Sequence, residues 1–117
     1  MWHKGDYRVI FRYEYPSNEA ARKAMEKMVD VGAIARVSNS YVKISTVAIL
    51  QRRVSQDGLS AWATLGCGYA FCSWQDKFNK SQGRTMAFTR AINQTQSPHR
   101  EVFGEMWNEH NKGATDE

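Results

Sequence analysis

The sequence predicts an α+β fold in which a mainly antiparallel sheet, with the element order β-α-β-β-β-α-α, is covered by helices. Three observations support this class. Apolar and polar residues alternate over residues 7–15, as in a half-buried strand. Asp57-Gly58 lies between two long, largely apolar segments, which is a strong signal for a β-hairpin. Ser17 and Ser97-Pro98 each precede a segment with apolar residues at helical spacing.

The N-terminal part is expected to contain one helix between strands. Pro16 ends the first strand, and Ser17 is a suitable N-cap for a helix that runs to about Val31. Gly32 fits the position after the helix C-terminus, where a left-handed backbone is common. We expect a further short strand at residues 33–37.

The hairpin strands are expected at residues 41–54 and 59–74. Gly66 and Gly68 interrupt the second strand and mark either a bulge or the close approach of another backbone. A helix is then expected from residue 76 or 77 to about residue 93, with Ser73 and Asp76 resembling a capping box. The final helix is expected to start at Ser97-Pro98, with Ser97 as its N-cap.

The length and composition indicate a single domain. The chain has 117 residues, of which 42% are hydrophobic, enough for one core. We expect residues 1–112 to form this α+β domain and residues 113–117 to be a flexible acidic tail. No apolar run reaches the roughly 20 residues of a membrane span, and no signal peptide is evident, so we expect a cytoplasmic protein without membrane contacts.

The positive charge is unevenly distributed along the chain. The formal net charge is +4, but residues 51–100 contain seven basic and two acidic residues, whereas residues 101–117 contain one basic and five acidic residues. Arg52-Arg53, near the predicted hairpin turn, is compatible with an anion-binding patch or with ordinary solvated charge.

Catalytic chemistry has little support in the sequence. The three histidines are scattered and accompany no nucleophile motif, and no P-loop or dinucleotide-binding glycine motif occurs. Cys67 and Cys72 have no neighbouring His or Cys cluster that would make a zinc site, and we expect both to be free thiols. We therefore expect a protein that is not an enzyme and that has no catalytic residues, no metal and no cofactor.

The segment over residues 68–91 carries the densest functional signal. It joins an apolar strand to the basic start of a helix, with aromatic and basic residues interleaved. A helix N-terminus favours anions, guanidinium groups bind phosphate, and aromatic rings stack on bases. This combination predicts a phosphate-bearing ligand, either a nucleotide or a nucleic acid. The candidate binding residues are Trp74, Asp76, Phe78, Lys80, Gly83, Arg84 and Arg90.

Helical phase separates the two arginines of this helix. At about 100° per residue, Arg84 projects with Phe88 toward the core side, and Arg90 projects away from it. An arginine on an apolar face needs a partner, which can be Asp76 or a bound anion, and both alternatives stay open. Gly83 would permit the close approach of a backbone or a ligand.

The same segment, GYAFCSWQDKFNKSQGRTMAFTRA, resembles small accessory proteins of bacteriophages, and the nearest named relatives are the anti-Thoeris nucleotide sponges. The resemblance covers about a fifth of the chain. It implies a non-catalytic counter-defence protein that binds and sequesters a phosphate-bearing nucleotide immune signal in the cytoplasm of the infected bacterial host. It also implies homo-oligomer formation, with pockets between subunits. The candidates carried over from the resemblance are Asp76, Phe78, Arg84 and Arg90.

Two alternatives remain open at this point. The protein could be an inhibitor that binds a host defence protein or nucleic acid, in the manner of an anti-CRISPR, and nucleic-acid binding would then weaken steeply as salt rises. It could also be an assembly module in which Arg84 pairs internally. Phe103, Met106 and Trp107 on the final helix fit either a core or an oligomer contact.

Overall fold

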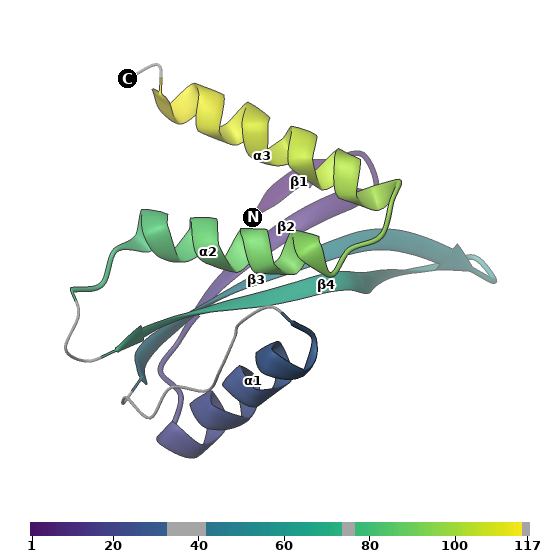
Figure 1. Cartoon of the computed structure of the whole chain (residues 1–117). Coiled ribbons are helices and arrows are strands. Elements are labelled where there is room, and N and C mark those ends of the chain that lie inside the picture. Colours follow the sequence, from purple (N-terminus) through teal and green to yellow (C-terminus); the bar gives the residue numbers. More distant parts are fainter. Residues whose placement is uncertain (33–41, 74–76, 116–117) are drawn as a thin grey trace.

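The structure is a computed structural model that describes residues 1–32, 42–73 and 77–115. It contains a four-stranded antiparallel sheet, with spatial strand order β1-β2-β3-β4, and three helices. The elements are β1 (Trp2–Lys4), β2 (Tyr7–Glu14), α1 (Asn18–Asp30), β3 (Val42–Gln56), β4 (Leu59–Ser73), α2 (Lys80–Asn93) and α3 (His99–Thr115). Figure 1 shows α1 on one face of the sheet and α2 and α3 on the other. The predicted α+β class is confirmed.

The element order differs from the prediction at the N-terminus. β1 pairs with β2 through Trp2↔Val9 and was not predicted, because three residues are too short to show an alternating pattern. The strand expected at residues 33–37 lies outside the described residues. α3 continues past Lys112 and ends at Thr115.

The long hairpin forms as predicted. β3 and β4 pair from Val42↔Ser73 to Gln56↔Leu59, so each strand contains 15 residues. Asp57 and Gly58 have φ values of 53° and 78°, and two successive left-handed residues give the type I′ turn that matches the twist of paired strands. The hairpin projects beyond the helices in Figure 1.

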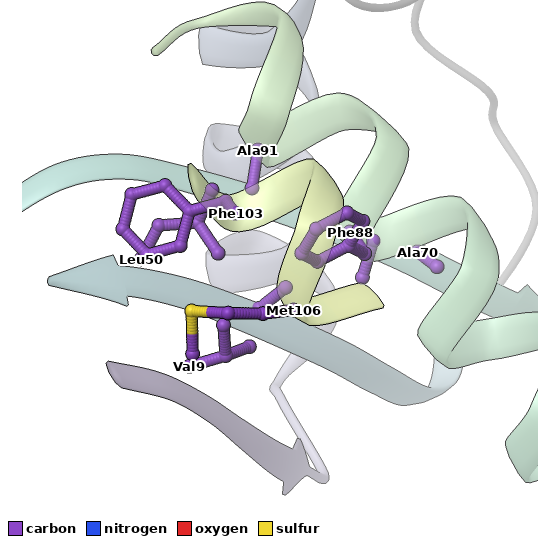
Figure 2. Packing of buried hydrophobic residues seen from close by; sticks show 9 residues of the cluster. Val9, Leu50, Ala70, Phe88, Ala91, Phe103 and Met106 are labelled. Carbon is purple, nitrogen blue, oxygen red and sulfur yellow. The ribbon is translucent and has the colours of Figure 1, made fainter. Parts of the chain in front are cut away.

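The main core lies between the sheet and the two C-terminal helices. Figure 2 shows side chains from both layers meeting there, with Phe103 and Met106 of α3 over Val9 and Leu50 of the sheet. The buried members are Val9, Ala48, Leu50, Ala70, Ala87, Phe88, Ala91, Phe103 and Met106. Phe103 and Met106 therefore belong to the core of the domain.

Gly66 and Gly68 let α2 pack very closely on β4. A Cβ atom at Gly68 would collide with the Ala87 carbonyl oxygen and the Ala91 nitrogen of the helix backbone. A Cβ atom at Gly66 would collide with the Thr95 side chain and also with the backbone of α2. The pairing register shifts beside Gly66 as well. Both predicted roles of these glycines, a bulge and a close approach, are therefore present.

α1 covers part of the opposite face of the sheet. Ser17 caps this helix as predicted, because its Oγ accepts a hydrogen bond from the Ala20 N–H at 3.2 Å. Met25 and Met28 are buried between α1 and the sheet. Among the described residues, none of the helices is both long and apolar enough to cross a membrane.

Candidate functional site

A pocket of about 440 Å³ opens where the start of α2 meets the first part of β3 and the end of β4. This volume lies in the range of small-molecule sites, about 300–1,000 Å³. Strand residues and the first turns of the helix form its walls. The lining residues are Thr46, Ala70, Phe71, Cys72, Lys77, Phe78, Asn79, Gln82, Gly83 and Met86.

The helix end at this pocket carries positive charge. Asn79 is the N-cap of α2, and its Oδ1 accepts a hydrogen bond from the Gln82 N–H at 3.1 Å. The other N–H groups of the first turn have no intrahelical acceptor and bear the positive end of the helix dipole. Lys77 lines the pocket, Lys80 begins the helix, and none of the described lining residues is acidic. The site therefore favours an anion.

Thr46 supplies a hydroxyl group at the pocket floor. The residue is only 1% exposed, and within the described part of the chain its side chain has no hydrogen-bond partner. No described side-chain oxygen or nitrogen is both sealed from solvent and unpaired, so the Thr46 Oγ1 keeps its access through the pocket. A ligand atom could satisfy this hydroxyl.

Gly83 lies directly over Thr46. A Cβ atom at Gly83 would be 2.6 Å from the Thr46 Oγ1, closer than real Cβ contacts. The helix can approach the strand at this point only because residue 83 has no side chain. The sequence predicted the close approach of a backbone or a ligand at Gly83, and the structure shows instead that the Thr46 side chain approaches it and that both residues line the pocket.

Aromatic contacts fix the rim of the pocket. Phe78 packs edge-to-face on Tyr13 of β2, with ring centroids 5.9 Å apart. The Lys80 Nζ lies 5.0 Å from the centroid of the same Tyr13 ring. Tyr13 thus holds one aromatic and one cationic side chain next to the pocket. Sequence reasoning placed Tyr13 only on a strand face.

The structure brings some of the predicted site residues together. Phe78 and Gly83 line the pocket, and Lys80 lies beside it. Trp74 and Asp76 lie outside the described residues. Arg84 is half-buried and, within the described part of the chain, forms no hydrogen bond or ion pair, so its pairing with Asp76 stays a prediction.

Arg90 points differently from what helical phase predicted. It is half-buried against β4, where its Nη1 donates a hydrogen bond to the Tyr69 carbonyl oxygen at 2.6 Å, and burial lowers the pKa of its guanidinium. The prediction that Arg90 projects away from the sheet was wrong. Gly83, Ala87 and Ala91 form the face of α2 that touches the strands. Arg90 lies about two helical turns after Gly83, so its side chain also reaches the sheet. Arg90 joins α2 to β4, away from the pocket lining.

The start of α2 also differs from the prediction. The helix begins at Lys80, three or four residues later than expected, because Asn79 and not Ser73 provides the cap. Sequence reasoning also missed Thr46, Asn79 and Gln82 as lining residues. The one available signal was the pair Ser45-Thr46, which interrupts an otherwise apolar strand segment and is buried.

Two of the histidines, His99 and His110, pack α3 against the N-terminal strands. His99 Nδ1 and the Tyr7 hydroxyl are hydrogen-bonded at 2.8 Å. His110 stacks on Trp2 with ring centroids 4.0 Å apart. In the described ranges no group of three or more His, Cys, Asp or Glu side chains is placed to hold a metal ion.

Neither cysteine forms a disulfide, and the two thiols lie in different surroundings. Cys67 lies on the face of β4 toward α1, and burial raises the pKa of its thiol. Cys72 lines the pocket on the other face. A reagent that enters the pocket would therefore meet Cys72.

Comparison of the chain with protein-family models, with curated proteins and with solved structures gives no match. The functional interpretation therefore rests on the pocket.

Proposed function

We propose that this protein binds a phosphate-bearing nucleotide in the pocket at the start of α2 and does not transform it chemically. The observation that carries the proposal is the Thr46 hydroxyl, which is buried, unpartnered within the described residues and accessible through the pocket beneath Gly83. A hydroxyl that no described protein group bonds, and that a pocket reaches, can donate a hydrogen bond to a ligand or accept one from it.

The lining residues suit the two ends of a nucleotide. A phosphate group would lie at the N-terminus of α2, where main-chain N–H groups and Lys77 meet it. The base or the sugar of the nucleotide would pack against Phe78 and Met86 at the rim of the pocket. Thr46 would then donate a hydrogen bond from the floor of the pocket.

Binding without turnover fits the chemistry of the lining. The described lining residues include one thiol, Cys72, and one amine, Lys77, and no His, Asp or Glu is among them. The specific form of the proposal is the one implied by the resemblance to the anti-Thoeris sponges. In that form, a phage counter-defence protein sequesters a nucleotide immune signal inside the infected cell and assembles as a homo-oligomer.

Isothermal titration calorimetry tests this proposal. The probes are isomers of cyclic ADP-ribose, cyclic oligonucleotides and AMP, with adenosine and inorganic phosphate as comparison ligands. We expect at least one nucleotide to bind more tightly than either comparison ligand, and mass spectrometry of the recovered ligand to show an unchanged mass. Absence of binding by every nucleotide contradicts the pocket assignment, and a cleaved product contradicts sequestration.

A charge variant links the binding to this pocket. Lys77→Gln should weaken nucleotide binding because it removes a cation from the lining. Lys23→Gln is the matched control, since Lys23 lies on α1 and is already paired with Glu19 at 3.4 Å. Equal losses in both variants would mean that only overall charge matters.

A further inference from the structure

A second cationic surface lies on the sheet face opposite α2 and α3. Side chains alternate along a strand, and Trp2, Lys4, Tyr7 and Val9 contact α3 or the core, so His3 and Arg8 point to the other face. Arg53 and Trp62, from the hairpin, join them there. We call this cluster of His3, Arg8, Arg53 and Trp62 the arginine–tryptophan face.

The cluster has a defined geometry. The Arg8 Cζ lies 4.0 Å and the Arg53 Cζ 5.0 Å from the centroid of the Trp62 ring. His3 meets the same ring edge-on, with centroids 6.1 Å apart. Trp62 is half-buried and Arg53 is exposed. Two guanidinium groups are thus gathered around a single indole.

Hydrogen bonds across the strands hold Arg8 in position. Its Nε donates to Gln51 Oε1 at 2.7 Å, and the Gln51 Nε2 donates in turn to Thr64 Oγ1 at 3.0 Å. Among the described residues, only the Nε of the Arg8 guanidinium donates a hydrogen bond. Its two terminal nitrogens have no acceptor among the described residues. Arg8 is therefore fixed in place with donors free.

The charge of this face is not compensated by the described part of the chain. Within it, neither Arg8 nor Arg53 forms an ion pair, and the same holds for Arg12, which lies further along the same face of β2. Lys4, by contrast, points to the opposite face and is paired with Glu105 and Glu109. Arg8 and Arg53, held beside one indole without an ion pair among the described residues, create a positive potential that favours a polyanion.

We propose that the arginine–tryptophan face binds single-stranded nucleic acid. Arg8 and Arg53 would contact phosphates through their free donors, and His3 and Trp62 would offer ring surface to unpaired bases. The face is built on strands and extends toward Arg12, which suits a chain-like ligand better than a mononucleotide. An acidic peptide would use the charge but not the rings. This site is separate from the α2 pocket, and neither proposal requires the other.

Fluorescence anisotropy with labelled 12-nucleotide oligo(dT) and oligo(rU) tests the proposal. We expect binding to both, weakening steeply between 50 and 200 mM salt, because phosphate contacts release counterions. The double variant Arg8→Gln/Arg53→Gln should weaken binding roughly tenfold or more and reduce the salt slope by about two, one for each phosphate contact. Trp62→Leu should weaken binding by about fivefold or more through lost stacking.

The matched control is Arg22→Gln/Lys23→Gln on α1, which removes the same charge from side chains already paired with Glu26 and Glu19. It should change oligonucleotide binding less than twofold. Circular dichroism melting checks each fold, and if the double variant melts early, Arg53→Gln alone replaces it because Arg53 is exposed. Equal losses in variant and control would overturn the proposal. So would a poly-glutamate peptide that binds as tightly as the oligonucleotides and displaces them.

Discussion

Gly83 on α2 and Thr46 on β3 meet so closely that a Cβ atom at position 83 would lie 2.6 Å from the Thr46 Oγ1. This contact brings a helix N-terminus and a buried hydroxyl to the same pocket. The glycine leaves the hydroxyl accessible, and the hydroxyl has no partner in the described chain.

Gly83→Ala should weaken nucleotide binding with little change in stability. The added methyl group gains up to about 1 kcal/mol in helix propensity, and this gain offsets the shift forced on Thr46. Calorimetric titration and urea denaturation measure the two effects. The control is Gly104→Ala, because Gly104 also lies in a helix but has nothing within 4 Å of its added Cβ. That change should stabilise the protein and leave binding unaltered.

Gly68→Ala should destabilise the fold strongly. Its Cβ would collide with the main chain of α2 at Ala87 and Ala91, and neither can move without displacing the helix. We expect a loss of about 3 kcal/mol in the free energy of unfolding, the upper end for overpacked sites. Urea denaturation gives the value. A loss below about 0.5 kcal/mol would show that α2 does not pack so closely on β4.

Arg90→Met should reduce stability and leave nucleotide affinity unchanged. The variant keeps an unbranched stem but removes the donor to the Tyr69 carbonyl oxygen, at a cost of about 1–3 kcal/mol if that oxygen remains unpaired. Thermal melting and titration of the same sample distinguish the roles. Loss of binding in a fully stable variant would restore Arg90 to the ligand site, as the resemblance implied.

The two thiols should differ in reactivity toward a maleimide at pH 8. Burial raises the pKa of Cys67 in the folded protein, so its thiolate fraction, and hence its labelling rate, should be low. Because the folded-state pKa is the higher one, the stabilising effect of this thiol is present below its unfolded pKa and is lost as pH rises through the folded value. A bound nucleotide should protect Cys72, which lines the pocket, and should not alter Cys67. Mass spectrometry of labelled peptides measures the labelling of each cysteine with and without nucleotide. Protection of Cys67 alone would contradict the pocket assignment.

Short sequence motifs correctly predicted those turns and helix ends whose conformation depends on the motif itself. Asp57-Gly58 specified the hairpin because both residues tolerate a left-handed backbone, and Ser17 specified the start of α1 through its side-chain cap. β1 was missed because its three residues derive their structure from pairing with β2. Such pairing leaves no periodic pattern in the sequence.

The site was less predictable for a related reason. Phe78, Lys80 and Gly83 were identified because they lie close together in sequence at a helix start. Thr46 joins them only through the tertiary packing of α2 on β3, about 37 positions away in the chain. The direction of Arg90 was mistaken because helical phase places it beside Gly83, on the side opposite Phe88, whereas Gly83 itself lies against Thr46 of β3.

The most direct test of the central claim is Thr46→Val, assayed by calorimetric titration with the tightest-binding nucleotide and by thermal melting. We expect a melting temperature close to that of the parent protein, because the Thr46 hydroxyl makes no hydrogen bond within the described residues that the variant would lose, together with roughly tenfold weaker binding. Thr89→Val is the control, since Thr89 is exposed on α2 outside the pocket lining, and its binding should match the parent. Unchanged nucleotide affinity in Thr46→Val would contradict the claim that this hydroxyl serves a ligand.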